Sequence, residues 1–444
     1  MPAPPKIEAM KSARAALLAV ALLALAGRAA NAQEIPTPLP LSVSVPDANV
    51  FLARQASLPG NPFLPAAQDY QGLPVGEWRL YPMLYSGFSF NDNLLNTNNQ
   101  KIADGAWNVT PTIVATRDQG VQNTAIYGTL TTTNYFQHPD ADFVVGRLGF
   151  QHLWEARRDL VFNFAGGITR SEDLSNGGGA LNTVTFLPIY DNTYKISAAA
   201  FKSFDRVFSN TTVALSNRQY DNATLTDGAS LPQSYRDYAE TLVRQRFGFD
   251  IGPVFYLFSD TSVNWRNTYN SPESASQGYR QTIGLGSLRF GLTMGEIFAG
   301  YQAQDYKSRL IGDVSDPVIG GRLVWSPRAY LSFSGTLDET IATQDFVTPA
   351  NPLPSAVKTL TATLGVHYAP NHRWSLSLNA GYGHDAFSNS TRRDDSFNLG
   401  ATLNYYISSK LVASLCTRQV VLNSSYTPAS YASNITSIGL RYRY

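Results

Sequence analysis

The chain has 444 residues, of which only 15% are charged, and its 34 basic and 33 acidic residues leave a net charge of +1. This balance disfavours nucleic acid as a partner, and the single cysteine excludes an internal disulfide framework. Aromatic residues make up 12% of the chain, with 24 tyrosines and 33 glycines, which suits membrane strands that carry interfacial rings.

Residues 1–32 are predicted to be a secretory signal peptide. Lys6, Lys11 and Arg14 precede an apolar run at 15–26, and Ala30-Asn31-Ala32 follows as a cleavage site. Because so short an apolar run cannot span a bilayer, we expect removal rather than anchoring. Cleavage near Ala32 leaves 30 basic and 32 acidic residues, a net charge of −2.

Residues 33–76 are predicted to be an extended, proline-rich periplasmic arm. Proline fixes φ and removes a backbone donor, so a segment with this many prolines forms neither strand nor helix. The arm is either a disordered lead-in or a plug that threads the barrel or contacts a periplasmic partner. Its 44 residues are too few for the folded plug domain of a TonB-dependent transporter.

Residues 77–444 are predicted to form an all-β, transmembrane antiparallel β-barrel. In residues 359–368, for example, Leu360, Leu364 and Val366 share one face, while Thr361 and Thr363 share the other. Alternation over about nine residues is the length that a tilted strand needs to cross hydrocarbon. We count eighteen such segments, with sixteen strands as the alternative, near 78–90, 104–117, 120–136, 141–155, 158–172, 192–204, 207–221, 236–250, 254–270, 277–292, 294–308, 317–326, 329–343, 357–369, 373–387, 394–407, 410–425 and 433–444.

The predicted connections alternate between short turns and long polar loops. Asp205-Arg206 and Ser408-Ser409 are typical of the short links that follow even-numbered strands. Residues 174–191, 222–235 and 343–356 are the long links that follow odd-numbered strands. This asymmetry is typical of outer-membrane barrels, in which the short turns are periplasmic.

The C-terminal stretch 434–444 is predicted to be the closing strand. Ile438, Leu440, Tyr442 and Tyr444 share an apolar face, and serine, glycine and two arginines share the other. An edge strand of a soluble β-sandwich is the alternative. The residues Gly439, Leu440, Tyr442 and Tyr444 also look like the C-terminal signal that outer-membrane assembly machinery reads.

Arginines dominate the charged positions that alternation places on the inner face. A ring of basic side chains would favour anions in a pore, and guanidinium forks suit carboxylates, phosphates and acidic sugars. The alternative is that acidic neighbours such as Glu240, Asp250 and Asp260 neutralise them, so that they only stiffen the barrel. The predicted lumen-lining arginines are Arg79, Arg147, Arg244, Arg246, Arg266, Arg280 and Arg322.

No set of residues in the sequence points to catalysis, to a metal or to another cofactor. His367 alone of the five histidines falls on a lumen-facing position, and no acidic residue is near it in sequence. Asn91-Asp92-Asn93 and Asp394-Asp395 could bind Ca²⁺ but are more typical of solvated loop tips. A barrel hydrolase is therefore disfavoured.

Several strand and turn motifs recur along the chain: Arg79-x-x-Pro82, Trp325-Ser326-Pro327, Tyr368-Ala369-Pro370 and the terminal residues 439–444. Over residues 77–444 the chain resembles outer-membrane proteins of the beta-barrel porin 2-like type, which are often encoded with exopolysaccharide genes. The resemblance implies the outer membrane of a Gram-negative bacterium, a role in polysaccharide secretion or small-solute passage, and no catalytic residues. The predicted arm has no clear counterpart in this pattern.

We therefore expect a non-enzymatic, passive conduit linked to exopolysaccharide export or to small-solute passage. The expected partners are outer-membrane lipid, the assembly machinery and polysaccharide export components. The alternative is a closed scaffold barrel that anchors a periplasmic complex through residues 33–76.

Overall fold

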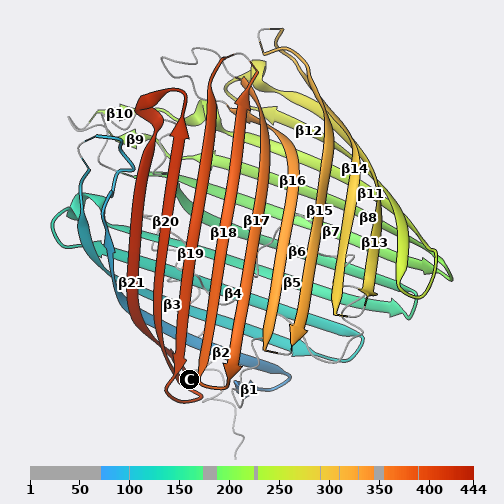
Figure 1. Cartoon of the computed structure of the whole chain (residues 1–444), viewed down its shortest axis with the longest axis horizontal. Coiled ribbons are helices and arrows are strands. Elements are labelled where there is room, and N and C mark those ends of the chain that lie inside the picture. The colour runs from blue at the N-terminus through green and yellow to red at the C-terminus, as the bar shows by residue number, and fades with distance from the viewer. Residues whose placement is uncertain are drawn as a thin grey trace, which may run out of the picture.

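The computed structural model is almost entirely β-structure (Figure 1). It describes residues 72–99, 101–173, 188–224, 229–290, 292–309, 311–328, 330–344, 355–388 and 390–444. The predicted signal peptide and nearly all of the predicted arm lie outside these ranges. Within the described ranges, no helix is both long enough and apolar enough to cross a membrane.

Eighteen long strands build the fold, each joined to the next in an antiparallel ladder. Their alternating side chains suit an extended backbone that buries one face and exposes the other. The strands are Trp78–Asn91 (β2), Asp104–Asp118 (β3), Gln122–Tyr135 (β4), Phe143–Arg157 (β5), Leu160–Asp173 (β6), Ile189–Phe204 (β7), Val207–Tyr220 (β8), Tyr238–Asp250 (β11), Phe255–Thr268 (β12), Ser276–Phe290 (β13), Thr293–Tyr306 (β14), Val314–Arg328 (β15), Leu331–Gln344 (β16), Ser355–Asn371 (β17), Trp374–Phe387 (β18), Arg393–Tyr406 (β19), Leu411–Ser424 (β20) and Tyr431–Arg443 (β21).

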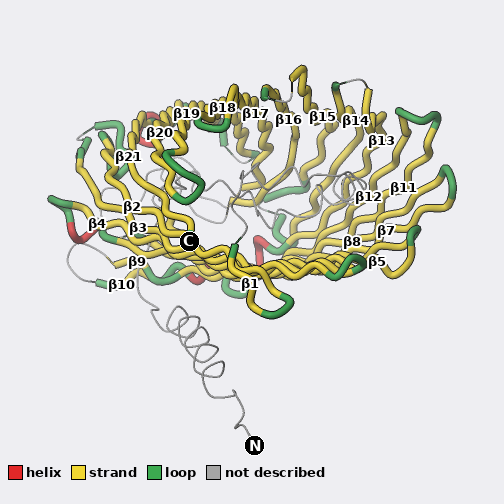
Figure 2. Tube along the Cα trace, turned by 90° about the horizontal axis from the view of Figure 1, so that it is seen from below, coloured by secondary structure: helices red, strands yellow, loops and turns green. Residues whose placement is uncertain are grey.

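The first and last long strands pair with each other and close the barrel. The ladder between β2 and β21 runs from Met83 opposite Arg443 to Asn91 opposite Ile435. Figure 2 shows the result as a flattened cylinder, with β2 to β8 in one wall and β15 to β21 in the facing wall. Closure removes the free sheet edges that hydrocarbon does not tolerate.

The predicted fold class and the count of eighteen strands are confirmed, so sixteen strands is wrong. Two predicted turns move by a few residues: Ser326-Pro327 and Ala369-Pro370 lie inside β15 and β17. Within the predicted arm, Leu73–Val75 form a short strand, β1, that pairs with the start of β2. The other short strands, Ala223–Thr224 (β9) and Ser230–Leu231 (β10), form a hairpin in the loop between β8 and β11.

The outer face of the barrel is apolar. Ile283, Ile297, Ile319 and Leu364 come from four different strands, and each is 64–67% exposed. A continuous apolar surface of this kind needs lipid rather than water as its solvent. Towards the ends of the strands, outward aromatic rings pack in pairs, as in Trp374 with Tyr405, whose centroids are 4.4 Å apart. Such rings are typical of the membrane–water interface.

The connections differ at the two ends of the barrel. At the short-turn end, two residues suffice to join many neighbouring strands, as at Asp205-Arg206, where Asp205 has a φ of 58°. A positive φ matches the twist of a tight hairpin. The loop end carries the longer connections, whose described parts include four short 3-10 turns such as Pro272–Ser274.

Single-cysteine labelling should establish the orientation of the barrel. In a Cys416→Ser background, Glu273→Cys lies at the loop end and Ser409→Cys lies in a turn at the short-turn end. A polyethylene-glycol maleimide too large for porins should label Glu273→Cys on intact cells, and Ser409→Cys only after permeabilisation, because short turns are periplasmic. Labelling in the reverse order would show that the orientation is inverted.

One junction of the wall departs from the regular ladder. β15 and β16 pair from Gly321 opposite Leu337 to Trp325 opposite Phe333, and again at Arg328 opposite Leu331. In the loop-end halves of β15 and β16, no ladder pairs are found among the described residues, and side-chain contacts connect this part of the wall. Ile341 packs against a cluster of Tyr306, Ile311, Val314 and Ala356, and Lys358 Nζ lies 2.7 Å from Asp316 Oδ1. Pro317, which lacks an amide donor, lies in this half, where a strand edge tolerates it.

Candidate functional site: the lumen surface

All seven arginines predicted to line the lumen lie on the strand face opposite the lipid-facing side chains. Arg246, for example, is 4% exposed, whereas its neighbour Phe247 is 55% exposed on the outer face. Arg147, Arg266, Arg280 and Arg322 are half-buried, and Arg79 is exposed. Their environments differ, however, and most of those on β11 to β13 are engaged by other side chains.

Arg244 and Arg246 belong to a buried, charge-balanced cluster. Asp260 accepts hydrogen bonds from Nε of both arginines, each at 2.7 Å. Nη1 of Arg246 donates to Oε1 of Glu296 at 2.8 Å, and the Tyr256 hydroxyl donates to the same oxygen at 2.6 Å. Two guanidinium groups thus face two carboxylates. This cluster, called the β11–β14 cluster below, balances two positive charges with two negative charges among its own members.

Aromatic rings cover this part of the lumen surface. Phe208, Tyr256 and Phe258 are buried together, and Phe201 and Phe298 pack against them. Gly286 stands between Tyr256 and Glu296 in the register of β12, β13 and β14. A Cβ at Gly286 would lie 2.2 Å from the Tyr256 ring. Glycine is therefore required for Tyr256 to cross β13 and reach Glu296.

The remaining predicted arginines have varied contacts. Arg280 Nη2 lies 2.5 Å from Asp338 Oδ1, and the Arg266 guanidinium lies 3.8 Å from the centroid of the Tyr238 ring. The predicted acidic neighbour Asp260 is in the β11–β14 cluster, and Glu240 accepts a hydrogen bond from Asn264 Nδ2 at 3.1 Å. The wall that carries most of the predicted lining arginines is thus largely self-neutralised.

A second group of lumen arginines was missing from the predicted lining set. Arg441 and Arg443 on β21 are 7% and 4% exposed, while Leu440 and Tyr442 beside them are 49% and 43% exposed. Arg418 on β20, which was also missing from that set, shares this face with Arg79 on β2, which belonged to it. The alternation in 434–444 already separated the two β21 arginines from the apolar residues, but the stretch was predicted as a closing strand and an assembly signal and not as part of the lumen lining.

These four residues, Arg79, Arg418, Arg441 and Arg443, form what we call the seam patch, because β20, β21 and β2 meet where the barrel closes. On the short-turn halves of these three strands, no lumen-facing position carries a carboxylate. Among the described residues, Arg418 Nη2 donates only to a neutral amide oxygen, that of Asn398, at 3.4 Å. Within the described part of the chain, Arg441 makes no ion pair, and its aromatic contact is the Tyr85 ring at 6.0 Å. Arg418 and Arg441 therefore bring to the seam patch positive charge that no carboxylate among the described residues compensates.

Residues of the predicted assembly signal lie on both faces of β21. Leu440, Tyr442 and Tyr444 point to the lipid side and are 43–55% exposed. Gly439 faces the lumen directly opposite Gly87 of β2. The Tyr85 hydroxyl would lie 2.5 Å from a Cβ at either glycine, so these two residues permit the ring to lie across the closing ladder.

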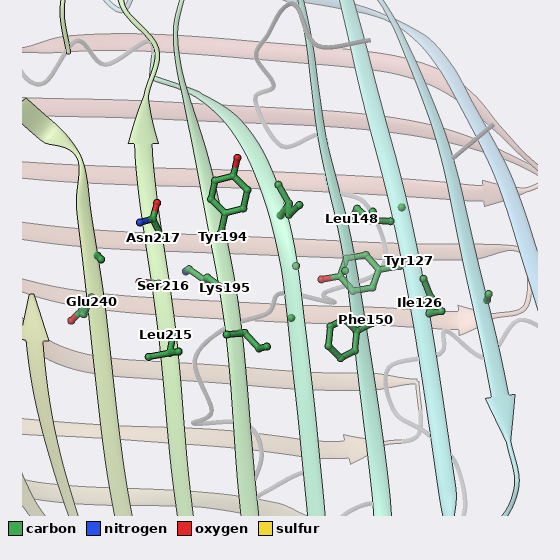
Figure 3. A pocket seen from close by; sticks show the side chains of 18 of the residues that line it. Ile126, Tyr127, Leu148, Phe150, Tyr194, Lys195, Leu215, Ser216, Asn217 and Glu240 are labelled. Carbon is green, nitrogen blue, oxygen red and sulfur yellow. The ribbon is translucent and has the colours of Figure 1, made fainter. Parts of the chain in front are cut away.

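An apolar pocket of about 1000 Å³ lies on the other side of the wall, over β3 to β11 (Figure 3). Outward side chains such as Ile126, Leu148, Phe150 and Leu215 line it, and all four are exposed. Because these positions face lipid, the pocket is part of the membrane-facing surface and not of the lumen.

The other polar motifs have structural roles. Asp92 accepts hydrogen bonds from Asn434 N and Nδ2, each at 2.7 Å, which ties the first loop to β21. Asp394 is held by Arg392 at 2.5 Å. His367 lies 3.1 Å from Ser377 Oγ. Within the described ranges, no three histidine, cysteine or acidic side chains cluster as a metal site would require.

A closed barrel of eighteen strands, apolar outside and polar inside, defines a porin-like β-barrel of the outer membrane. The chain belongs to the family described as "Putative beta-barrel porin 2", whose family model matches residues 66–444. The predicted resemblance is thereby confirmed.

Solved structures with the same type of barrel are distant in sequence. The outer membrane protein opdK from Pseudomonas aeruginosa is 9% identical over 82% of this chain and 98% of its own, with a TM-score of 0.43. The siderophore receptor PirA from the same organism is 10% identical over 82% of this chain and 80% of its own, also with a TM-score of 0.43. Identities this low carry no information about the solute. A search of curated proteins found no match.

Proposed function

We propose that the protein is a passive conduit for small solutes with a preference for anions. The charges of Arg418 and Arg441, which no carboxylate among the described residues compensates, are the observation that carries this proposal, because fixed positive charges in a confined lumen attract anions and repel cations. Barrels of 16–18 strands are wide enough for an aqueous channel. Acidic saccharides are the solute class that the proposal favours, since guanidinium forks bind carboxylates and aromatic rings stack on sugars.

The link to exopolysaccharide export is part of the same proposal and is supported by the sequence resemblance. We further propose that Gly439, Leu440, Tyr442 and Tyr444 are read by the assembly machinery and that polysaccharide export components are partners. The support for the assembly role is the outward apolar face of the closing strand, which is what a machine that pairs with this strand in lipid would meet.

Planar-bilayer recordings of the purified protein should show conduction and an anion-selective reversal potential in a salt gradient. Arg418→Gln removes a lumen charge whose described partner is a neutral amide, so we expect the anion-to-cation permeability ratio to fall about two- to fivefold. Arg373→Gln, in an exposed turn, is the matched control and should leave the ratio unchanged. Equal effects of the two variants would contradict a lumen role for Arg418.

A closed scaffold barrel is the second candidate function, favoured by the aromatic layer of Phe208, Tyr256 and Phe258 on the lumen surface. The two candidates differ in conduction. Removing residues 33–71 leaves the β1–β2 pairing intact and tests whether the predicted arm blocks the lumen. If neither the full-length protein nor the deletion variant gives conductance in planar bilayers, the conduit is ruled out and the scaffold is favoured.

A further inference from the structure

We propose that Arg441 and Arg443 form a binding subsite for an oxyanion, a carboxylate or a phosphate group, on the lumen surface near the short-turn end. The inference deepens the proposed conduit, and it rests on that function only for the route by which the anion arrives. Its basis is the burial of Arg441 without a counter-charge.

Burial makes the lone charge of Arg441 costly. Its side chain is 7% exposed, yet within the described part of the chain it forms neither an ion pair nor a hydrogen bond, and the Tyr85 ring lies 6.0 Å away. An uncompensated buried charge is strongly destabilising, because the solvation that it loses is not replaced by a partner. Arg443, two residues along the same face, adds a like charge. An anion at this position would offset both effects.

The β11–β14 cluster provides a comparison, because it contains a buried arginine that has carboxylate partners. Arg246 is about as buried as Arg441, but Asp260 lies 2.7 Å away and Glu296 lies 2.8 Å away. The lumen faces of β20, β21 and β2 offer Arg441 no comparable partner in their short-turn halves. Arg441 thus differs from Arg246 in lacking a carboxylate partner among the described residues.

The residues packed around Arg441 leave its guanidinium suitable for binding a planar, charged ligand group. The Tyr85 ring lies across Gly87 and Gly439, and its hydroxyl is hydrogen-bonded to Ser437. Val412 is fully buried opposite Arg441 on β20. A guanidinium beside an aromatic ring keeps its edge N–H groups available, and this fork matches two oxygens of a carboxylate or phosphate.

Binding to the purified full-length protein in neutral detergent tests the site without any need for conduction. Inorganic phosphate and glucuronate are the probes, glucose is the uncharged control, and the ionic strength is held constant because salt screens such contacts. We expect a saturable rise in the thermal unfolding midpoint with either anion and none with glucose. Arg441→Gln should weaken binding at least about tenfold, as expected for the loss of one charge-assisted fork.

Arg147→Gln is the matched control, since Arg147 is a half-buried lumen arginine on the far wall and should be neutral to binding. Heat-modifiable migration in gels verifies that each variant is folded. If Arg441→Gln does not fold, phenylglyoxal modification of the wild-type protein provides a second measurement, because phosphate should protect Arg441 and not Arg147. Unchanged affinity in Arg441→Gln, an equal response to glucose, or no protection would each overturn the site. Phosphate binding without conduction would support the proposed site and contradict the proposed conduit.

Discussion

Asp260→Asn should lower the free energy of unfolding by about 3–5 kcal/mol, because removal of one partner leaves a buried charge without compensation. Asp260 accepts hydrogen bonds from both Arg244 and Arg246. Without it, two guanidinium groups share a single carboxylate, that of Glu296, in a site where Arg246 is 4% exposed. Urea unfolding in detergent, followed by tryptophan fluorescence, measures the loss.

Two further variants make this prediction specific. Glu77→Gln removes the partner of Arg117 in a pair at the short-turn end, where Glu77 is 65% exposed, and should cost less than about 1 kcal/mol. The double variant Arg244→Gln/Asp260→Asn restores the balance of charge and should recover part of the loss, because the two residues are coupled. A loss from Asp260→Asn as small as that from Glu77→Gln would show that the cluster does not hold the wall together.

Gly439→Ala should impair closure of the barrel and lower the free energy of unfolding by about 1–3 kcal/mol, as forced overpacking does. A Cβ at Gly439 would lie 2.5 Å from the Tyr85 hydroxyl and 2.7 Å from the backbone oxygen of Ser86. The backbone atom cannot turn aside, so the β2–β21 ladder has to shift. We expect less heat-modifiable protein in the outer-membrane fraction.

Gly381→Ala is the matched control on the lumen face of β18. There the nearest atom to an added Cβ is Asn398 Cβ at 3.5 Å, an ordinary contact. This variant should assemble like the wild-type protein. Equal assembly defects in both variants would mean that glycine is needed for strand flexibility in general. Wild-type assembly of both variants would mean that the seam tolerates a methyl group.

The strands were predictable because their signal is local. Segments such as 359–368 alternate residue by residue, and a period of two requires no knowledge of the partner strand. The same argument placed Arg246 and Arg280 on the lumen face and Leu440 and Tyr442 on the lipid face. Turn positions were predicted less accurately, since Ser326-Pro327 and Ala369-Pro370 carry turn residues but lie inside strand ends.

The charge balance of the lumen could not be predicted, because it depends on contacts between strands that are distant in sequence. Arg246 and Glu296 are 50 residues apart and lie on strands separated by two others, so the order and register of four strands are needed to bring them together. The same holds for Arg280 with Asp338 and for the side-chain contacts that join β15 and β16 at the loop end.

For this protein, then, the sequence by itself determined an eighteen-strand barrel with an apolar exterior and a basic interior, because alternation and turn chemistry act over a few residues. Only the tertiary structure decided which basic residues remain uncompensated. Arg244 and Arg246 meet carboxylates across neighbouring strands, whereas Arg441 meets none in the described part of the chain. The reason is physical: a charge is neutralised by what lies within a few ångströms in space, and closure of the barrel sets those distances.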